Sequence, residues 1–174
     1  MENTGNDSTI PCSIEKMIKE QGYFIYTNVG TSMMPLLRQR KDLIEIKHKE
    51  ADRCKKYDVV LYKRGEKYIL HRILKVLPDG YLIAGDHCTF VERDIKDEHI
   101  LGVLTRVIRN GRTITPNNLW YKAYVHLWCD CYPVRMGIIK GKQKMNYVLR
   151  AVKKIILHDS QNDKESHEQQ SSAD

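Results

Sequence analysis

The central part of the chain consists of short apolar runs separated by turn residues, a pattern typical of β-strands. The first run, YFIYTNV at 23–29, is rich in β-branched and aromatic residues and stops at Gly30. Five similar runs and a weaker one after Asn110-Gly111 follow it, at 42–47, 58–63, 68–77, 81–84 and 100–109. Because no helical segment separates these runs, the pattern predicts a mainly β domain with an antiparallel, barrel-like or sandwich sheet.

Helical patterns lie on either side of this β region. Ser13 can cap a short helix in which Ile14, Met17 and Ile18 recur on one side, ending near Gln21-Gly22. The segment 118–157 again has helical periodicity, interrupted around Pro133. The pattern divides the chain into a polar N-terminus with a short helix (1–22), a β domain (23–117), a basic amphipathic helical extension (118–158) and a disordered acidic tail (159–174).

Composition and charge narrow the class of protein. A length of 174 residues suits one compact domain. Residues 118–158 contain 8 Lys/Arg and 1 Asp/Glu, so this segment alone carries a charge of +7, equal to the net charge of the whole chain. No run approaches the ~18 apolar residues of a membrane-spanning helix, and 1–12 lacks an apolar leader, so we expect a cytoplasmic protein. Of the five cysteines only Cys129 and Cys131 are near neighbours, which favours free thiols and no metal.

Three segments of the β region carry candidate chemistry. Ser32 follows the first strand in the segment Gly30-Thr31-Ser32-Met33-Met34-Pro35-Leu36-Leu37, although a serine in a turn is more often structural. His71 alternates with Ile69 and Ile73 on one face of the strand 68–77, where apolar neighbours favour the neutral ring, as in a catalytic base or in a structural core histidine. Gly85-Asp86-His87 ends a later strand, with Glu92, Asp94 and Asp97 downstream as carboxylates that could orient a histidine or simply lie on the surface.

The order and spacing of these segments resemble those of the S24/S26 serine peptidases, the group that contains type I signal peptidases and self-cleaving SOS-repressor proteins. The matching boxes are Ser32-Met33-Met34-Pro35-Leu36-Leu37, Tyr57-Asp58-Val59-Val60, Leu70-His71-Arg72 and Gly85-Asp86-His87. The resemblance covers about 29–107 and implies a coiled β-barrel domain like that of signal peptidases and SOS repressors. His71-Arg72 is similar to the endoplasmic-reticulum and archaeal branch, in which histidine replaces the lysine base of bacterial signal peptidases.

The resemblance also implies a set of roles. Ser32 would be the nucleophile, His71 the general base, and Asp86, Glu92 or Asp94 the acid that orients His71. The backbone N–H of Ser32 would form part of the oxyanion hole, and Thr31, Met33, Met34 and Pro35 would lie along the oxyanion and substrate-binding region. Lys67 and Lys75 lie on the His71 face and are alternative bases, each four residues away. No cofactor is expected.

The expected function is that of a serine endopeptidase of the signal-peptidase-like type, with an extended peptide or protein precursor as substrate. The alternatives are a non-catalytic member that binds peptides or partners, and an autoprotease that uses the same residues. The basic extension 118–158 either lies on an anionic membrane surface, which would make the protein peripheral on the inner face, or packs on the β domain. No recognition motif accompanies the positive charge, so nucleic acid is not expected as a partner.

Overall fold

The computed structural model describes residues 14–171, and the chain divides into two compact units after Asp130. The first unit begins with helix α1 (Ile14–Gln21), followed by strands β1 to β5. These strands are β1 (Tyr23–Thr27), β2 (Leu43–His48), β3 (Val59–Arg64), β4 (Lys67–Leu77) and β5 (Gly80–Ala84). The unit continues with β6 (Glu92–Ile95), the short 3-10 helix η1 (Asp97–His99), β7 (Ile100–Arg109), β8 (Arg112–Ile114) and helix α2 (Leu119–Asp130). Ser13, the expected cap of the first helix, lies outside the described residues.

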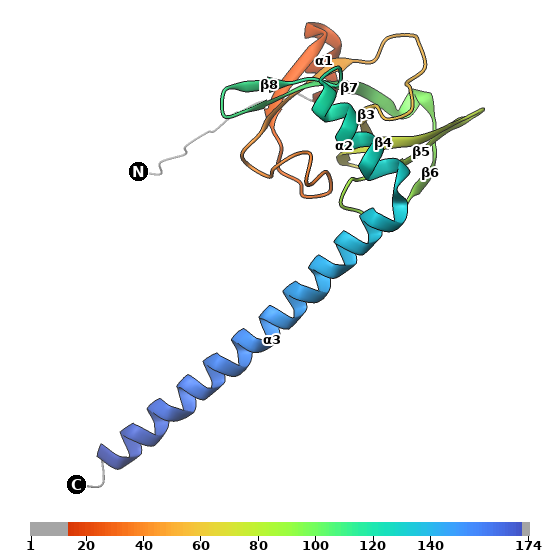
Figure 1. The fold of residues 1–174 in the computed structure, drawn as a ribbon. Helices are drawn as coiled ribbons and strands as arrows, with labels where there is room; N and C mark the ends of the chain where they lie inside the picture. The colour runs from red at the N-terminus through yellow and green to blue at the C-terminus, as the bar shows by residue number, and fades with distance from the viewer. Residues whose placement is uncertain (1–13, 172–174) are drawn as a thin grey trace, which may run out of the picture. The chain divides into compact units, whose positions relative to one another are not determined.

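All strand pairs are antiparallel and form one sheet in the order β1-β2-β7-β3-β4-β5-β6, with β8 paired to β7. The curved strands of this sheet are visible in Figure 1. Turn residues separate these strands, as the sequence pattern predicts. Gly65 and the pair Asn110-Gly111 have positive φ in the two tight hairpins β3–β4 and β7–β8. The prediction of a mainly β domain is therefore confirmed.

The sheet buries side chains on both of its faces. In β4, Leu70 packs into one apolar cluster with Val59 and Leu61, whereas Ile73 packs into a second cluster with Val60. Neighbouring residues of a strand point to opposite faces, so each strand contributes to both clusters. The alternation expected for the strand around His71 is present, and it separates His71 from Arg72 on opposite faces.

Two elements differ from the sequence expectations. Strand β6 was not expected, because its sequence ERDI has no apolar alternation; it forms at the sheet edge by pairing with β5. Helix α3 (Tyr132–Ser171), which makes up most of the second unit, continues through most of the segment 159–174 that was expected to be a disordered tail. That segment contains no Gly or Pro, so nothing in it breaks a helix. Pro133 lies in the first turn of α3, where proline is compatible with a helix.

Candidate active site

Ser32 lies in the loop that follows β1. The Met33 and Leu37 side chains, on either side of the exposed Pro35, are buried in the same apolar cluster, which anchors the loop to the core. The backbone N–H of His87 donates a hydrogen bond of 2.7 Å to the carbonyl oxygen of Ser32. This bond joins the Ser32 segment directly to the Gly85-Asp86-His87 segment, two of the three segments that the sequence singles out.

Gly85 lies between the backbone carbonyl of Ser32 and the ring of His71, and there is no space for a side chain at this position. A Cβ atom on Gly85 would lie 2.6 Å from the carbonyl oxygen of Ser32 and 3.0 Å from Cδ2 of His71. Both atoms thus lie within 3.0 Å of one point, so they are within about 6 Å of each other. Three of the four segments that carry the resemblance therefore meet at one place in the fold, and the absence of a side chain at Gly85 permits it.

Glu92 is the carboxylate that reaches His71. The Nδ1 atom of His71 lies 2.9 Å from Oε1 of Glu92, and both side chains are largely buried. The Tyr62 hydroxyl donates to the same carboxylate oxygen at 2.8 Å, and Nη1 of Arg64 donates to the other oxygen at 2.6 Å. A carboxylate facing Nδ1 favours a proton on that nitrogen, which leaves the lone pair on Nε2.

The environment of His71 favours its neutral form. Burial lowers the pKa of His71 below its ordinary value of 6.5, and the nearby Glu92 carboxylate opposes this shift without reversing it. At neutral pH the ring is therefore uncharged and Nε2 can accept a proton. Cδ2, the atom next to Nε2, is the ring atom closest to the position that a Cβ of Gly85 would occupy.

The Ser32 hydroxyl makes no hydrogen bond to His71 in the part of the chain that the structure describes. Catalytic hydrogen bonds are often long before a substrate binds and shorten in the complex. The backbone N–H groups of Ser32 and Met34 differ in whether they already donate a hydrogen bond. The backbone N–H of Met34 is already bonded to the carbonyl of Thr31 at 3.1 Å, whereas the backbone N–H of Ser32 makes no hydrogen bond to another described residue. Of these two N–H groups, that of Ser32 is therefore the one that can donate a hydrogen bond to an oxyanion.

Asp86, one of the three acids expected to orient His71, pairs with Arg72. Its two carboxylate oxygens accept hydrogen bonds from Nε and Nη2 of Arg72 at 2.8 and 2.7 Å. Both side chains are fully buried, and the paired carboxylate raises the pKa of the Arg72 guanidinium despite its burial. Asp86 therefore holds Arg72, on the face of β4 opposite to His71, and does not orient the histidine.

Helix α2 completes the surroundings of this buried ion pair. The Tyr124 hydroxyl donates to Oδ2 of Asp86 at 2.9 Å, and Nε1 of Trp128 donates to the Asp86 backbone carbonyl at 2.7 Å. Nη1 of Arg72 donates to the hydroxyl of Tyr121 at 3.2 Å. The first part of the extension 118–158 thus packs on the β domain, which was one of the two alternatives for that segment.

Among the described residues, no hydrogen bond or ion pair joins the remaining sequence candidates to the His71 ring. Asp94 is exposed and has a positive φ, and Thr31 and Pro35 are also exposed. The alternative bases Lys67 and Lys75 are exposed on β4. Sequence reasoning missed Tyr62 and Arg64. Their spacing of two residues on one strand is a signal that both side chains share the face that holds Glu92.

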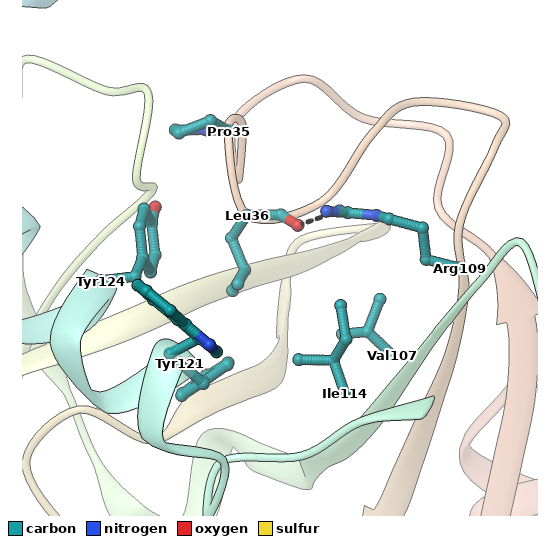
Figure 2. A pocket seen from close by; sticks show the side chains of 8 residues that line it. Pro35, Leu36, Val107, Arg109, Ile114, Tyr121 and Tyr124 are labelled. Atoms are coloured by element: carbon teal, nitrogen blue, oxygen red, sulfur yellow. Dashed lines mark hydrogen bonds between the residues drawn. The ribbon is translucent and has the colours of Figure 1, made fainter. Parts of the chain in front are cut away.

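A pocket of about 240 Å³ lies beside the Ser32 loop (Figure 2). Its walls are mainly apolar and aromatic, formed by Pro35, Leu36, Val107, Arg109, Ile114, Trp120, Tyr121 and Tyr124. The one charged lining residue, Arg109, is paired with Asp42 and donates to the carbonyl of Leu36 at 2.6 Å. Because this charge is already neutralised, the pocket suits an apolar or aromatic group.

The part of the chain that the structure describes contains no cluster of three or more His, Cys, Asp or Glu side chains that could hold a metal ion. None of its cysteines forms a disulfide. Burial raises the pKa of the Cys54 thiol to about 11, which keeps this group protonated.

Comparison with known proteins identifies no relative: no family model, no curated protein and no solved structure matches the chain. Among the described residues, no helix has the length and apolar character needed to cross a membrane.

Proposed function

We propose that this chain is a serine endopeptidase of the signal-peptidase-like type, with Ser32 as nucleophile and His71 as general base. The observation that carries the proposal is the meeting of the Ser32 loop, the buried His71–Glu92 pair and Gly85 at one place. The resemblance of the same segments to a serine-peptidase family is independent of this geometry. A buried neutral histidine with a carboxylate on Nδ1 has the arrangement required of a general base.

The proposed reaction begins when Oγ of Ser32 forms a bond to the scissile carbonyl carbon while Nε2 of His71 takes the hydroxyl proton. Glu92 stabilises the imidazolium, and the Ser32 backbone N–H donates to the developing oxyanion. The C–N bond then breaks as His71 returns the proton to the leaving amine. Water, deprotonated by His71 in the same way, hydrolyses the acyl-enzyme and releases Ser32.

Strand β1 provides the track for the substrate. It lies at one end of the strand order and leads directly into the Ser32 loop. Tyr23 and Ile25 on this edge strand are exposed. An extended peptide could pair with such an edge by backbone hydrogen bonds and continue past the nucleophile. The pocket beside Pro35 and Leu36 would receive an apolar or aromatic side chain of that peptide.

Labelling with a fluorophosphonate probe, which reacts with activated serine hydroxyls, tests the proposal. We expect labelling of the wild-type protein and its loss in Ser32→Ala and in His71→Ala. Matched controls are Thr89→Val, which removes an exposed hydroxyl, and His99→Ala, which removes an exposed histidine. Equal labelling of all five proteins would overturn the catalytic proposal and leave the alternative of a non-catalytic peptide-binding domain.

The autoprotease alternative uses the same residues and needs a different measurement. Wild-type protein would be mixed with a tagged Ser32→Ala chain, and the tagged chain would be followed for cleavage. Cleavage of the tagged chain shows attack on a separate molecule, whereas cleavage confined to the wild-type chain shows attack within one molecule.

A further inference from the structure

The first part of helix α3, residues 132–154, is strongly basic and is defined here as the basic segment. It contains seven Lys or Arg residues and no Asp or Glu. Such a uniform charge does not stabilise a helix through internal ion pairs. The partner that this segment suits must therefore be negatively charged.

One side of the basic segment is apolar and exposed. Six large apolar side chains on it are between 46% and 60% exposed: Val134, Ile138, Met145, Val148, Leu149 and Val152. With 3.6 residues per turn, these positions, together with Gly137 and Gly141, fall within an arc of about 120° that contains no charged residue. The apolar arc is continuous over about five turns.

Basic residues border the apolar arc on both sides. Lys142 flanks one border and Lys144 the other, while Lys140, Arg150 and Lys154 lie farther round the helix. Lysine side chains at such borders can bury their methylene groups while the ammonium groups extend toward polar headgroups.

We propose that the basic segment lies in the surface of a membrane rich in anionic lipids, with the apolar arc inserted and the lysines against the headgroups. An anionic membrane surface satisfies both properties at once, since it accepts apolar side chains and attracts positive charge. A second copy of this chain would place two uniformly basic helices together, and a nucleic acid would leave the apolar arc in water. This inference does not depend on the proposed catalytic activity.

Co-sedimentation of the full Ser32→Ala chain with vesicles tests the inference without any contribution from catalysis. We expect binding to vesicles of mixed phosphatidylglycerol and phosphatidylcholine, and at least tenfold weaker binding to phosphatidylcholine alone, because each basic residue near an anionic surface strengthens binding about fivefold. Equal binding to both vesicle types, or binding to neither, would overturn the proposal.

Two matched double variants test the apolar arc. Val148→Ser with Val152→Ser removes apolar area from the arc and should lower the partition coefficient on the mixed vesicles about tenfold or more. Gln143→Ser with Asn146→Ser changes exposed polar positions off the arc and should lower it less than threefold. Neither pair alters the charge, so equal effects would overturn insertion of the arc.

Light scattering in the absence of vesicles separates membrane binding from self-association. We expect the same molar mass, that of a single chain, for the unmodified chain and for both double variants. A dimer that the Val148→Ser/Val152→Ser variant dissociates would overturn the proposal and assign the apolar arc to a second copy.

Discussion

Nδ1 of His71 lies 2.9 Å from Oε1 of Glu92, although strand β5 separates the strands that carry these two residues. The contact spans the width of β5. It forms because Glu92, the first residue of β6, lies opposite Ile83 of β5. Tyr62 and Arg64 of β3 reach the same carboxylate from the other side of β4. Four strands of the sheet therefore fix the orientation of one imidazole ring.

Replacement of Glu92 by Gln should lower kcat/KM for peptide cleavage by about 10²–10⁴-fold, because the ring would lose its anionic partner during proton transfer. The measurement is cleavage of a peptide substrate or the rate of fluorophosphonate labelling. Asp94→Asn is the matched control, since it neutralises an exposed carboxylate two residues away. A large loss with Asp94→Asn and none with Glu92→Gln would contradict the assignment.

The pH dependence of activity should reflect the lowered pKa of His71. The neutral ring is the active base, so kcat/KM should rise with pH through a midpoint below 6.5 and then level off. The Glu92 carboxylate raises the pKa of His71 while burial lowers it, so Glu92→Gln should move this midpoint to still lower pH. A midpoint above 6.5 in the wild-type protein would contradict the burial argument.

The same pKa shift has a consequence for folding. Because the folded-state pKa of His71 is below its unfolded value, the unfolded chain binds the proton more readily at acid pH. The contribution of the neutral ring to stability is complete above pH 6.5 and is lost as the pH falls toward the folded-state pKa. Urea denaturation at several pH values, compared between wild type and His71→Phe, should show a smaller loss toward acid pH in the variant.

Gly85→Ala should abolish labelling of Ser32, because the added Cβ would lie 2.6 Å from the Ser32 carbonyl oxygen and 3.0 Å from the His71 ring. Backbone atoms cannot retreat as a flexible side chain can, so the Ser32 loop must move. Gly30→Ala is the matched control, since the nearest atom to its Cβ would be Oγ of Ser32 at 4.0 Å, an ordinary contact. Circular dichroism establishes whether both variants fold, and a folded, fully active Gly85→Ala protein would contradict the close approach.

The Arg72–Asp86 pair should contribute to stability and not to proton transfer. Asp86→Ala leaves a buried guanidinium without its carboxylate, and removal of one partner of such a pair costs about 3–5 kcal/mol. The free energy of unfolding in urea measures this loss. Glu20→Ala, which removes the exposed carboxylate beside Lys16, serves as control and should cost less than about 1 kcal/mol. Similar losses in both variants would show that burial of the Arg72–Asp86 pair is unimportant.

The sequence predicts the strands of this fold better than it predicts the contacts of the site. The alternation around His71 is readable because Leu70 and Ile73 enter different apolar clusters. The short strand β6 is not readable, because residues 92–95 are mostly polar and acquire strand geometry only by pairing with β5. Glu92 can therefore be selected as one of several acids, but its contact with His71 depends on a strand pairing that no local pattern indicates.

The role of Asp86 illustrates the same limit. Its position beside Gly85 suggests proximity to the site, and the structure places it there, but its carboxylate faces Arg72. Residues 71 and 72 point to opposite faces of β4, so acids at similar sequence distances serve different partners. Spacing along the chain does not distinguish them without the register of β4 and β5.

The pocket beside the Ser32 loop should influence which peptides are cleaved. Ile114 lines the pocket together with Leu36 (Figure 2), so Ile114→Trp adds bulk to the pocket wall. This variant should lower kcat/KM about tenfold for peptides with a large apolar side chain near the cleaved bond, because that side chain loses one apolar contact site. Peptides with alanine there should be affected little, and fluorophosphonate labelling should be unchanged because Ser32 and His71 do not line the pocket. Thr113→Trp, at the neighbouring position on the other face of β8, is the matched control. An equal loss for large and small side chains would show that the pocket does not receive the substrate.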